Sequence, residues 1–349
     1  MKQGKSLEEL ARELDRQNTV KRDFIVPARG IEMTRGNDGL EFLMSSSKGS
    51  ECFGASSHFH HQVATTLDIP QKYYQLMYEK NPDLLVNNVN SWLDRSDKRH
   101  TVRLLDGRGR AFLSDRYRMI DNYQVASAVL PIIGQIEGAK IESCEVTDHH
   151  MYLKVVNPRL EAEVFPGDIV QSGICISNSE VGLGAVKVVP LLYRLVCSNG
   201  MVVNDLASRN YHIGRAEERE WELFSDETRM LDDAAFMAKI SDIVRSTIDA
   251  VRFEKVVQTL RDAREHSIEG NIIDVVDLAA KELTINKDEQ GSVLTHLIAG
   301  GDLSKYGLAN AVTQASKTSG SYERATELEA MGWNIIKWTG STWKRLNAA

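Results

Sequence analysis

Apolar residues recur at helical spacing near the start of the chain, between about 58 and 137, and throughout the last third. A helix is predicted over residues 6–17, with Ser6 as N-cap and Glu9 completing a capping box. Between residues 58 and 80 we expect two helices that separate near Pro70, because proline cannot continue a helix. Further helices are predicted at about 82–94 and 122–137.

The pattern changes to strand-like runs over residues 139–208. The candidate strands there are Lys140–Glu145, His150–Val156, Asp168–Ser177, Leu183–Val196 and Met201–Asn204. The dipeptide Asn199-Gly200 is typical of a tight type I′ turn between the last two. Upstream, a hairpin is predicted around Asp106–Gly109, between strands Thr101–Leu105 and Arg110–Leu113.

One long helix is predicted from about 227 to 265, followed by shorter helices near 273–283, 288–299, 304–318 and 320–331. Together these elements predict an α+β fold with a mixed or antiparallel β-rich core, flanking helices and an all-helical C-terminal part. We divide the chain into an N-terminal helical arm (1–19), an α+β core domain (20–213), a helical region led by the long helix (214–331) and a Trp-rich tail (332–349).

Composition narrows the class of protein. Of 349 residues, 42% are apolar and 26% charged, which is typical of a globular protein and not of a disordered one. No apolar run approaches the ~20 residues of a membrane span, and the charged N-terminus does not look like a signal peptide. Four widely spaced cysteines without a CxxC pair indicate reduced thiols. We therefore expect a cytoplasmic protein of a bacterial host cell, without membrane contact.

The charge distribution is uneven. The net charge is −7, yet residues 95–118 contain eight Lys or Arg and only three Asp. Trp92 and Tyr123 lie beside this basic segment, so cations for phosphates occur together with rings for bases. The predicted nucleic-acid-binding residues are Arg95, Lys98, Arg99, Arg103, Arg108, Arg110, Phe112, Arg116, Tyr117 and Arg118. By alternation, Arg108 and Arg110, and likewise Arg116 and Arg118, should share one exposed face. The alternative is a solvated hairpin whose arginines pair with Asp97, Asp106, Asp115 and the acidic stretch near 217–233.

Three of the five tryptophans lie within eleven residues near the C-terminus. We predict a hairpin over residues 337–344, with Gly340-Ser341 as a type II′ loop and two rings on the same side. Its tip would be a stacking or docking surface formed by Trp338, Trp343, Lys344 and Arg345. The alternative is an edge ribbon that docks on the core.

Other patterns carry less chemistry. His58, His60 and His61 follow Cys52, but this spacing is not that of a zinc site, and we expect no metal or other cofactor. The Gly182-Leu183-Gly184 segment lies between two candidate strands, so we interpret it as a turn and not as a phosphate loop. No catalytic motif is found, although an active site without a linear motif would be invisible at this level.

Several segments resemble the phage/plasmid-like family of uncharacterised proteins known as domain of unknown function 932. The resemblance spans roughly residues 5–331 and is carried by 67–73 (LDIPQKY), 89–93 (VNSWL), 110–118 (RAFLSDRYR), 178–182 (NSEVG), 193–201 (YRLVCSNGM), 310–313 (NAVT) and 322–329 (YERATELE). It implies a phage, prophage or plasmid setting and supplies no active site.

From these observations we expect a non-enzymatic, single-stranded DNA-binding or annealing protein of a mobile element. It would act in recombination or replication and self-associate through the long helix. Strands followed by a long helix are similar to the order of elements in phage annealing proteins, which is an analogy of fold alone. The alternative is a self-assembling structural or host-interaction protein that binds no nucleic acid.

Overall fold

The computed structural model describes residues 1–36, 39–46, 49–204, 225–247 and 249–347. Within them, the chain forms twelve α-helices and eleven strands in three antiparallel sheets, which confirms the α+β class. None of the helices in these residues is both long and apolar enough to cross a membrane.

A five-stranded sheet forms the centre of the molecule, with strand order β11-β10-β9-β8-β7. Its strands are β7 (Lys140–Val146), β8 (Met151–Phe165), β9 (Asp168–Asn178), β10 (Lys187–Arg194) and β11 (Asn199–Val202). The middle strands β8 and β9 are buried along most of their length. Such two-sided burial requires helices on both faces of the sheet.

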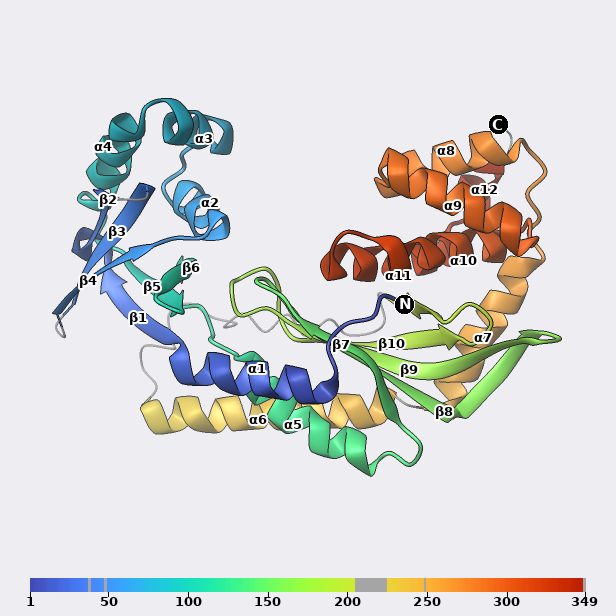
Figure 1. Cartoon of the computed structure of the whole chain (residues 1–349). Coiled ribbons are helices and arrows are strands. Elements are labelled where there is room, and N and C mark those ends of the chain that lie inside the picture. Colours follow the sequence, from blue (N-terminus) through green and yellow to red (C-terminus); the bar gives the residue numbers. More distant parts are fainter. Residues whose placement is uncertain (37–38, 47–48, 205–224, 248, 348–349) are drawn as a thin grey trace.

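The helices that cover one face come from distant parts of the chain (Figure 1). They are α1 (Leu7–Val20), α5 (Asn122–Gln135) and α6 (Asp226–Thr247). Their apolar residues pack on Leu153, Val155, Ile174 and Ile176, which point to this face by strand alternation. The opposite face is covered by α10 (Lys305–Ala315) and α11 (Tyr322–Lys337).

A smaller unit lies at one end of the sheet and holds two three-stranded sheets and three helices (Figure 1). One sheet has the order β1-β5-β6 and the other β2-β3-β4. The bounds are β1 (Arg22–Pro27), β2 (Ile31–Gly36), β3 (Gly39–Ser46), β4 (Gly49–Gly54), α2 (Ser57–Thr66), α3 (Gln71–Lys80), α4 (Pro82–Leu93), β5 (Arg99–Leu105) and β6 (Arg108–Ser114). Phe42, Phe53, Phe59 and Phe112 are the aromatic centre of its core.

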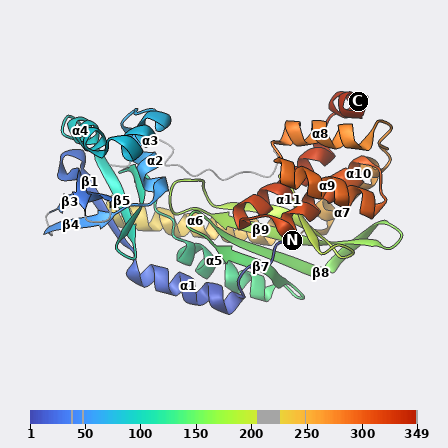
Figure 2. The same ribbon diagram turned by 45° about the horizontal axis from the view of Figure 1, so that its top comes forward.

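The remaining helices gather at the opposite end of the sheet (Figure 2). They are α7 (Ala250–Arg264), α8 (Ile272–Leu283), α9 (Lys287–Gly300) and α12 (Gly340–Asn347), which share one apolar core with α10 and α11. Trp333 and Trp343 are both buried in this core.

Local sequence signals predicted several elements correctly. Ser6 caps α1 in a capping box with Glu9. Helices α2 and α3 separate at Pro70, as expected of proline. The β5–β6 hairpin turns at Asp106 and Gly107, both with positive φ, as a two-residue type I′ loop requires.

Three predictions are wrong. The single helix over 227–265 is two helices, α6 and α7; Asp249 caps the second with a side-chain hydrogen bond to the amide of Arg252. The dipeptide Asn199-Gly200 begins β11, and the turn before it uses Ser198 with φ 48°. The Asn199 amide is instead buried and donates to Oγ1 of Thr313 in α10.

The predicted C-terminal hairpin is also wrong. Residues 322–337 and 340–347 are helices α11 and α12, and Gly340 begins the second of them. The predicted boundary in the acidic stretch 213–226 lies largely outside the described residues.

Candidate nucleic-acid interface

The basic segment 95–118 does not form one exposed face. Arg103 in β5 is completely buried. Its guanidinium binds Asp23 through Nε at 2.8 Å and Nη2 at 2.9 Å, and Asp121 through Nη2 at 2.6 Å. Its Nη1 donates to the carbonyl of Glu180 at 2.9 Å. Because every arm of this guanidinium is occupied, Arg103 joins the small unit to the central sheet and is not available to nucleic acid.

Arg110 is held in the same junction. It forms an ion pair with Glu180, whose other carboxylate oxygen accepts from the amide of Asn122 at 2.5 Å. The segment 178–182 carries part of the family resemblance. Its residues 178–181 are buried and connect β9 to the small unit. The prediction that Arg110 is exposed is wrong because this segment packs over it.

Arg118 pairs with acidic residues of α6. Its guanidinium lies 3.0 Å from Asp232 and 2.6 Å from Asp233, and it stacks on the ring of Phe236 at 4.7 Å. Its side chain is almost completely buried. The prediction of an exposed Arg118 is wrong, and its pairing agrees with the alternative of a neutralised hairpin.

Two predicted stacking rings are also unavailable. Phe112 is buried against Phe59 and the ring of His100. Tyr117 is half-buried, and its hydroxyl donates to the carbonyl of Ser179 at 3.1 Å. Burial raises the pKa of Tyr117 above its ordinary value. Both rings belong to the packing of the small unit and its junction.

The other cations of the segment are exposed: Arg95, Lys98, Arg99, Arg108 and Arg116. Arg99 lies 4.0 Å from Asp115, which is a weak, solvent-screened pair. Within the described residues, neither Arg95 nor Lys98 forms an ion pair. These two are the predicted residues best placed to meet a phosphate.

Arg95 and Lys98 line a groove between the α2–α3 junction, the end of α4 and the start of β5, which we call the Trp92 groove. Its volume is about 490 Å³. Its other lining residues are Thr66, Leu67, Asp68, Ile69, Pro70, Tyr73, Asn88, Trp92, Ser96 and His100. Two segments that carry the family resemblance, 67–73 and 89–93, therefore meet there.

The groove presents large rings to solvent. Trp92 is 50% exposed and Tyr73 45% exposed. The guanidinium of Arg95 lies 5.9 Å from the centre of the Trp92 ring, within range of a cation–π contact. His100 is buried, and no described residue hydrogen-bonds to its Nδ1. Burial lowers the pKa of His100, so the ring is neutral near pH 7.

Sequence reasoning placed Trp92 beside the basic segment but missed Tyr73 and His100. Tyr73 lies in the first turn of α3, at an outward position. A bulky ring on the polar side of an amphipathic helix is the signal that would have identified it. His100 had no local signal, because its burial depends on packing against Phe112.

The C-terminal residues lie elsewhere. Trp343 is 6% exposed in the helical core and Trp338 is half-buried, so neither forms an open stacking tip. Lys344 and Arg345 are exposed on α12, where Arg345 pairs with Glu282 at 2.9 Å. Figures 1 and 2 place α12 at the end of the sheet opposite to α4, so these residues and the Trp92 groove are separate surfaces.

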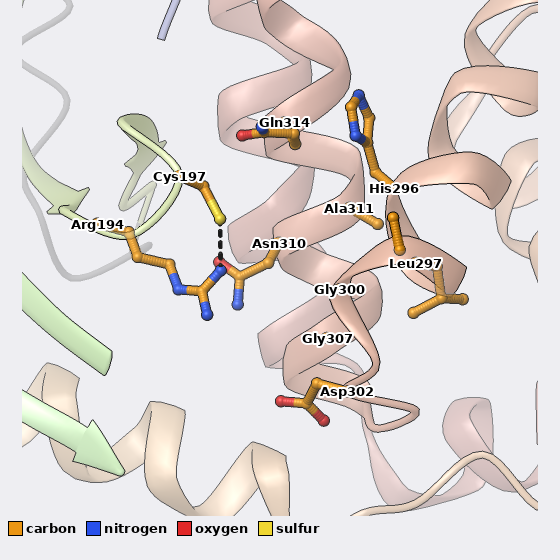
Figure 3. Close-up of a pocket in the computed structure, with 11 residues that line it drawn as sticks. Arg194, Cys197, His296, Leu297, Gly300, Asp302, Gly307, Asn310, Ala311 and Gln314 are labelled. Carbon is orange, nitrogen blue, oxygen red and sulfur yellow. Dashed lines mark hydrogen bonds between the residues drawn. The ribbon is translucent and has the colours of Figure 1, made fainter. Parts of the chain in front are cut away.

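A third location is a cavity of about 210 Å³ between the β10–β11 turn and helices α9 and α10 (Figure 3). Arg194 enters it beside Cys197 and donates to the sulfur through Nη1 at 3.0 Å. The same guanidinium binds Asp168 through Nε at 2.5 Å, and Tyr306 donates to that carboxylate at 2.8 Å. Since Asp168 already neutralises Arg194, the described lining residues offer no free Lys or Arg side chain to an anionic ligand.

Comparison with known families gives one match. The model of the family described as Domain of unknown function (DUF932) matches residues 111–315. The chain belongs to the DUF932 family. No curated protein and no solved structure shows a significant match to it.

The DUF932 match covers the central sheet, helices α5–α10 and the cavity of Figure 3. It begins after all the residues that line the Trp92 groove. The groove therefore lies on the small unit, N-terminal to the matched segment.

Proposed function

We propose that this DUF932 protein binds single-stranded DNA in the Trp92 groove and acts, without bond chemistry, in recombination or replication of a phage or other mobile element. One observation carries the proposal: a half-exposed tryptophan lies beneath an arginine that has no ion pair among the described residues, in a groove that also holds an exposed tyrosine and a lysine. Stacking platforms beside backbone cations are what sequence-tolerant strand binding requires.

We expect base stacking to contribute more to the free energy of binding than electrostatic attraction does. A base that stacks on an aromatic side chain gains about 1–3 kcal/mol. Arg95 and Lys98 are opposed in the groove by Asp68, so the local excess of charge is small. Neutralising two or three phosphates of a single strand predicts a salt slope of only about −1.4 to −2.

The test is fluorescence anisotropy with a labelled oligothymidine and with a duplex of equal length, at two salt concentrations. We expect the single strand to bind more tightly than the duplex. Trp92→Ala should weaken binding about 5- to 150-fold, the equivalent of one lost stack. Arg95→Ala should weaken it and flatten the salt dependence.

Arg12→Ala is the matched control, because Arg12 is an exposed arginine on α1 whose only described partner is Glu8. It removes the same charge and should leave binding unchanged. If Arg12→Ala and Arg95→Ala reduced the affinity for the oligonucleotide equally, the strand would be attracted by the charge of the protein and not by the groove. A folded Trp92→Ala protein with wild-type affinity would refute the groove as the site.

The second candidate is a self-assembling structural or host-interaction protein without nucleic-acid binding. It is favoured by three exposed apolar side chains on the two helices that replace the predicted long one: Met230, Leu231 and Val251. The buried residues of α6, however, pack on the chain's own sheet face, so the helix length no longer argues for assembly. Sedimentation across micromolar concentrations distinguishes a monomer from an assembly.

A further inference from the structure

Four parts of the sequence that the proposed function leaves unused meet in one pocket, which we call the histidine pocket. They are the His58–His61 cluster of α2, His149 from the β7–β8 turn, Arg108 at the start of β6, and Leu183 of the Gly182–Gly184 loop. One side of α3 completes it with Gln71, Tyr74, Gln75 and Tyr78. The pocket has a volume of about 680 Å³.

Tertiary contacts fix the position of its histidines. The rings of His58 and His149 lie 5.3 Å apart, and Nε2 of His58 is 2.9 Å from the carbonyl of Val181. That carbonyl also accepts from the Gln62 amide at 2.7 Å. His60 is buried behind them and shares a 2.8 Å hydrogen bond with the hydroxyl of Tyr74. The small unit and two loops of the central sheet thus both contribute residues to the pocket wall.

The described residues that line the pocket include one permanent charge, the Arg108 guanidinium, and no acidic side chain. Four of them are histidines, and burial lowers the pKa of two of these, His58 and His60. Arg108 uses Nη2 to donate to the carbonyl of Ala55 at 3.1 Å. No other partner is found for its guanidinium among the described residues, so further N–H donors remain for a ligand. In a chain with a net charge of −7, an acid-free pocket with a permanent cation favours an anion over a cation.

We propose that the histidine pocket binds a nucleotide, that is, a phosphate monoester of a sugar that carries a planar base. The phosphate would lie between the Arg108 guanidinium and the imidazoles of His61 and His149, because His58 already donates to the Val181 carbonyl. A phosphate has three oxygens to accept from such a set of donors, and arginine is suited to hold two of them.

The volume of the histidine pocket and its other lining residues favour a nucleotide over an inorganic anion. A volume of about 680 Å³ lies in the range of sites for small organic ligands and far exceeds the needs of inorganic phosphate. Tyr78 is 37% exposed and offers a ring face, while Leu183 offers apolar surface. The amides of Gln71 and Gln75 offer both donors and acceptors to the edge of a base.

This site is separate from the Trp92 groove. The two sites share no lining residue, and α3 contributes Tyr73 to the groove but Tyr74 and Tyr78 to the pocket. A nucleotide from solution and the 5′-terminal nucleotide of a strand both offer this phosphate and base. The proposal therefore stands whether or not single-stranded DNA binds in the groove.

Isothermal titration calorimetry of the full chain with AMP, adenosine and inorganic phosphate tests the proposal. We expect one AMP per chain, bound more tightly than either adenosine or phosphate. Arg108→Ala and His149→Ala should each weaken AMP binding about tenfold or more, because charge-assisted hydrogen bonds are lost.

His266→Ala is the control for His149→Ala, because His266 is exposed and lies after α7, outside the pocket. Preferential binding of a 5′-phosphorylated oligonucleotide over its 5′-hydroxyl form, lost in Arg108→Ala, would identify a strand end as the source. No saturable AMP binding, equal affinity for AMP and adenosine, or unchanged affinity in folded Arg108→Ala and His149→Ala proteins would overturn the proposal.

Discussion

Nη2 of Arg103 lies 2.6 Å from Oδ1 of Asp121, in a place where the arginine side chain has no contact with solvent. Asp121 also pairs with Lys21 and forms the capping box of α5. The neighbouring cations hold the pKa of Asp121 below its ordinary value, although burial acts in the opposite direction. This contact joins the β1-β5-β6 sheet to the start of α5, one of the helices that cover the central sheet.

Arg103→Met should destabilise the protein by about 3–5 kcal/mol, because it leaves the buried carboxylate of Asp121 with Lys21 alone and removes the cation that Asp23 binds. Chemical denaturation measures the change. Arg95→Met, on an exposed arginine of the same basic segment, should change stability by less than about 0.5 kcal/mol. Similar losses in both variants would contradict the junction role of Arg103.

A second buried ion pair joins the central sheet to α11. Nζ of Lys154 donates to Glu329 at 2.6 Å and to Thr326 at 2.9 Å, and both charged side chains are fully buried. Lys154→Met alone should cost about 3–5 kcal/mol, since Glu329 would keep an unpaired charge in the core. Combining it with Glu329→Leu should restore most of that loss in thermal or chemical unfolding. A double variant that is less stable than Lys154→Met alone would contradict the role assigned to the unpaired Glu329 carboxylate.

Trp343→Ala should destabilise the protein by about 3–5 kcal/mol, because a large side chain is removed from the helical core. Affinity for an oligonucleotide should not change in the protein that remains folded. Trp338→Ala is the matched comparison and should cost less, since Trp338 is only half-buried. Wild-type stability together with reduced affinity would restore the predicted docking role of the C-terminus.

Stability should depend on pH through His60. Burial, with a smaller contribution from the nearby charge of Arg108, lowers the pKa of His60 to about 4. The unfolded chain therefore binds a proton below about pH 6.5, whereas the folded chain does not until about pH 4. Neutral His60 therefore contributes to the free energy of unfolding above pH 6.5, and this contribution is lost as the pH falls. The free energy of unfolding should decrease by about 2 kcal/mol between pH 7 and pH 5.

His60→Asn should remove this part of the pH dependence, because its amide can replace Nδ1 in the contact with Tyr74 without titrating. Denaturant unfolding at about pH 7 and about pH 5 measures it. His61→Asn is the control, because His61 is exposed on the same helix. If the free energy of unfolding of His60→Asn changed between the two pH values as much as that of the wild type, His60 would not be the group responsible.

Short-range signals are the part of the fold that could be predicted. Pro70 lies between two helices as predicted, Ser6 caps another, and Asp106-Gly107 forms the turn of a hairpin, because each acts on residues close to it in sequence. The Asn199-Gly200 signal is equally local but was overridden: the Asn199 side chain binds Thr313, 114 residues away. A turn propensity is weaker than the cost of leaving a buried amide without partners.

The candidate sites also depend partly on local sequence signals and partly on contacts between distant segments. The sequence by itself determined the α+β class, most helix positions, and the presence of cations and rings near residues 92–118. Only the tertiary structure decided that Arg103, Arg110 and Arg118 meet carboxylates while Arg95 and Lys98 do not, and that His149 joins His58. The reason is physical: alternation and periodicity fix the direction of a side chain from its own element. What covers that side chain is set by packing of segments far away in the sequence, and burial with a partner decides whether a charge stabilises the fold or remains free to bind.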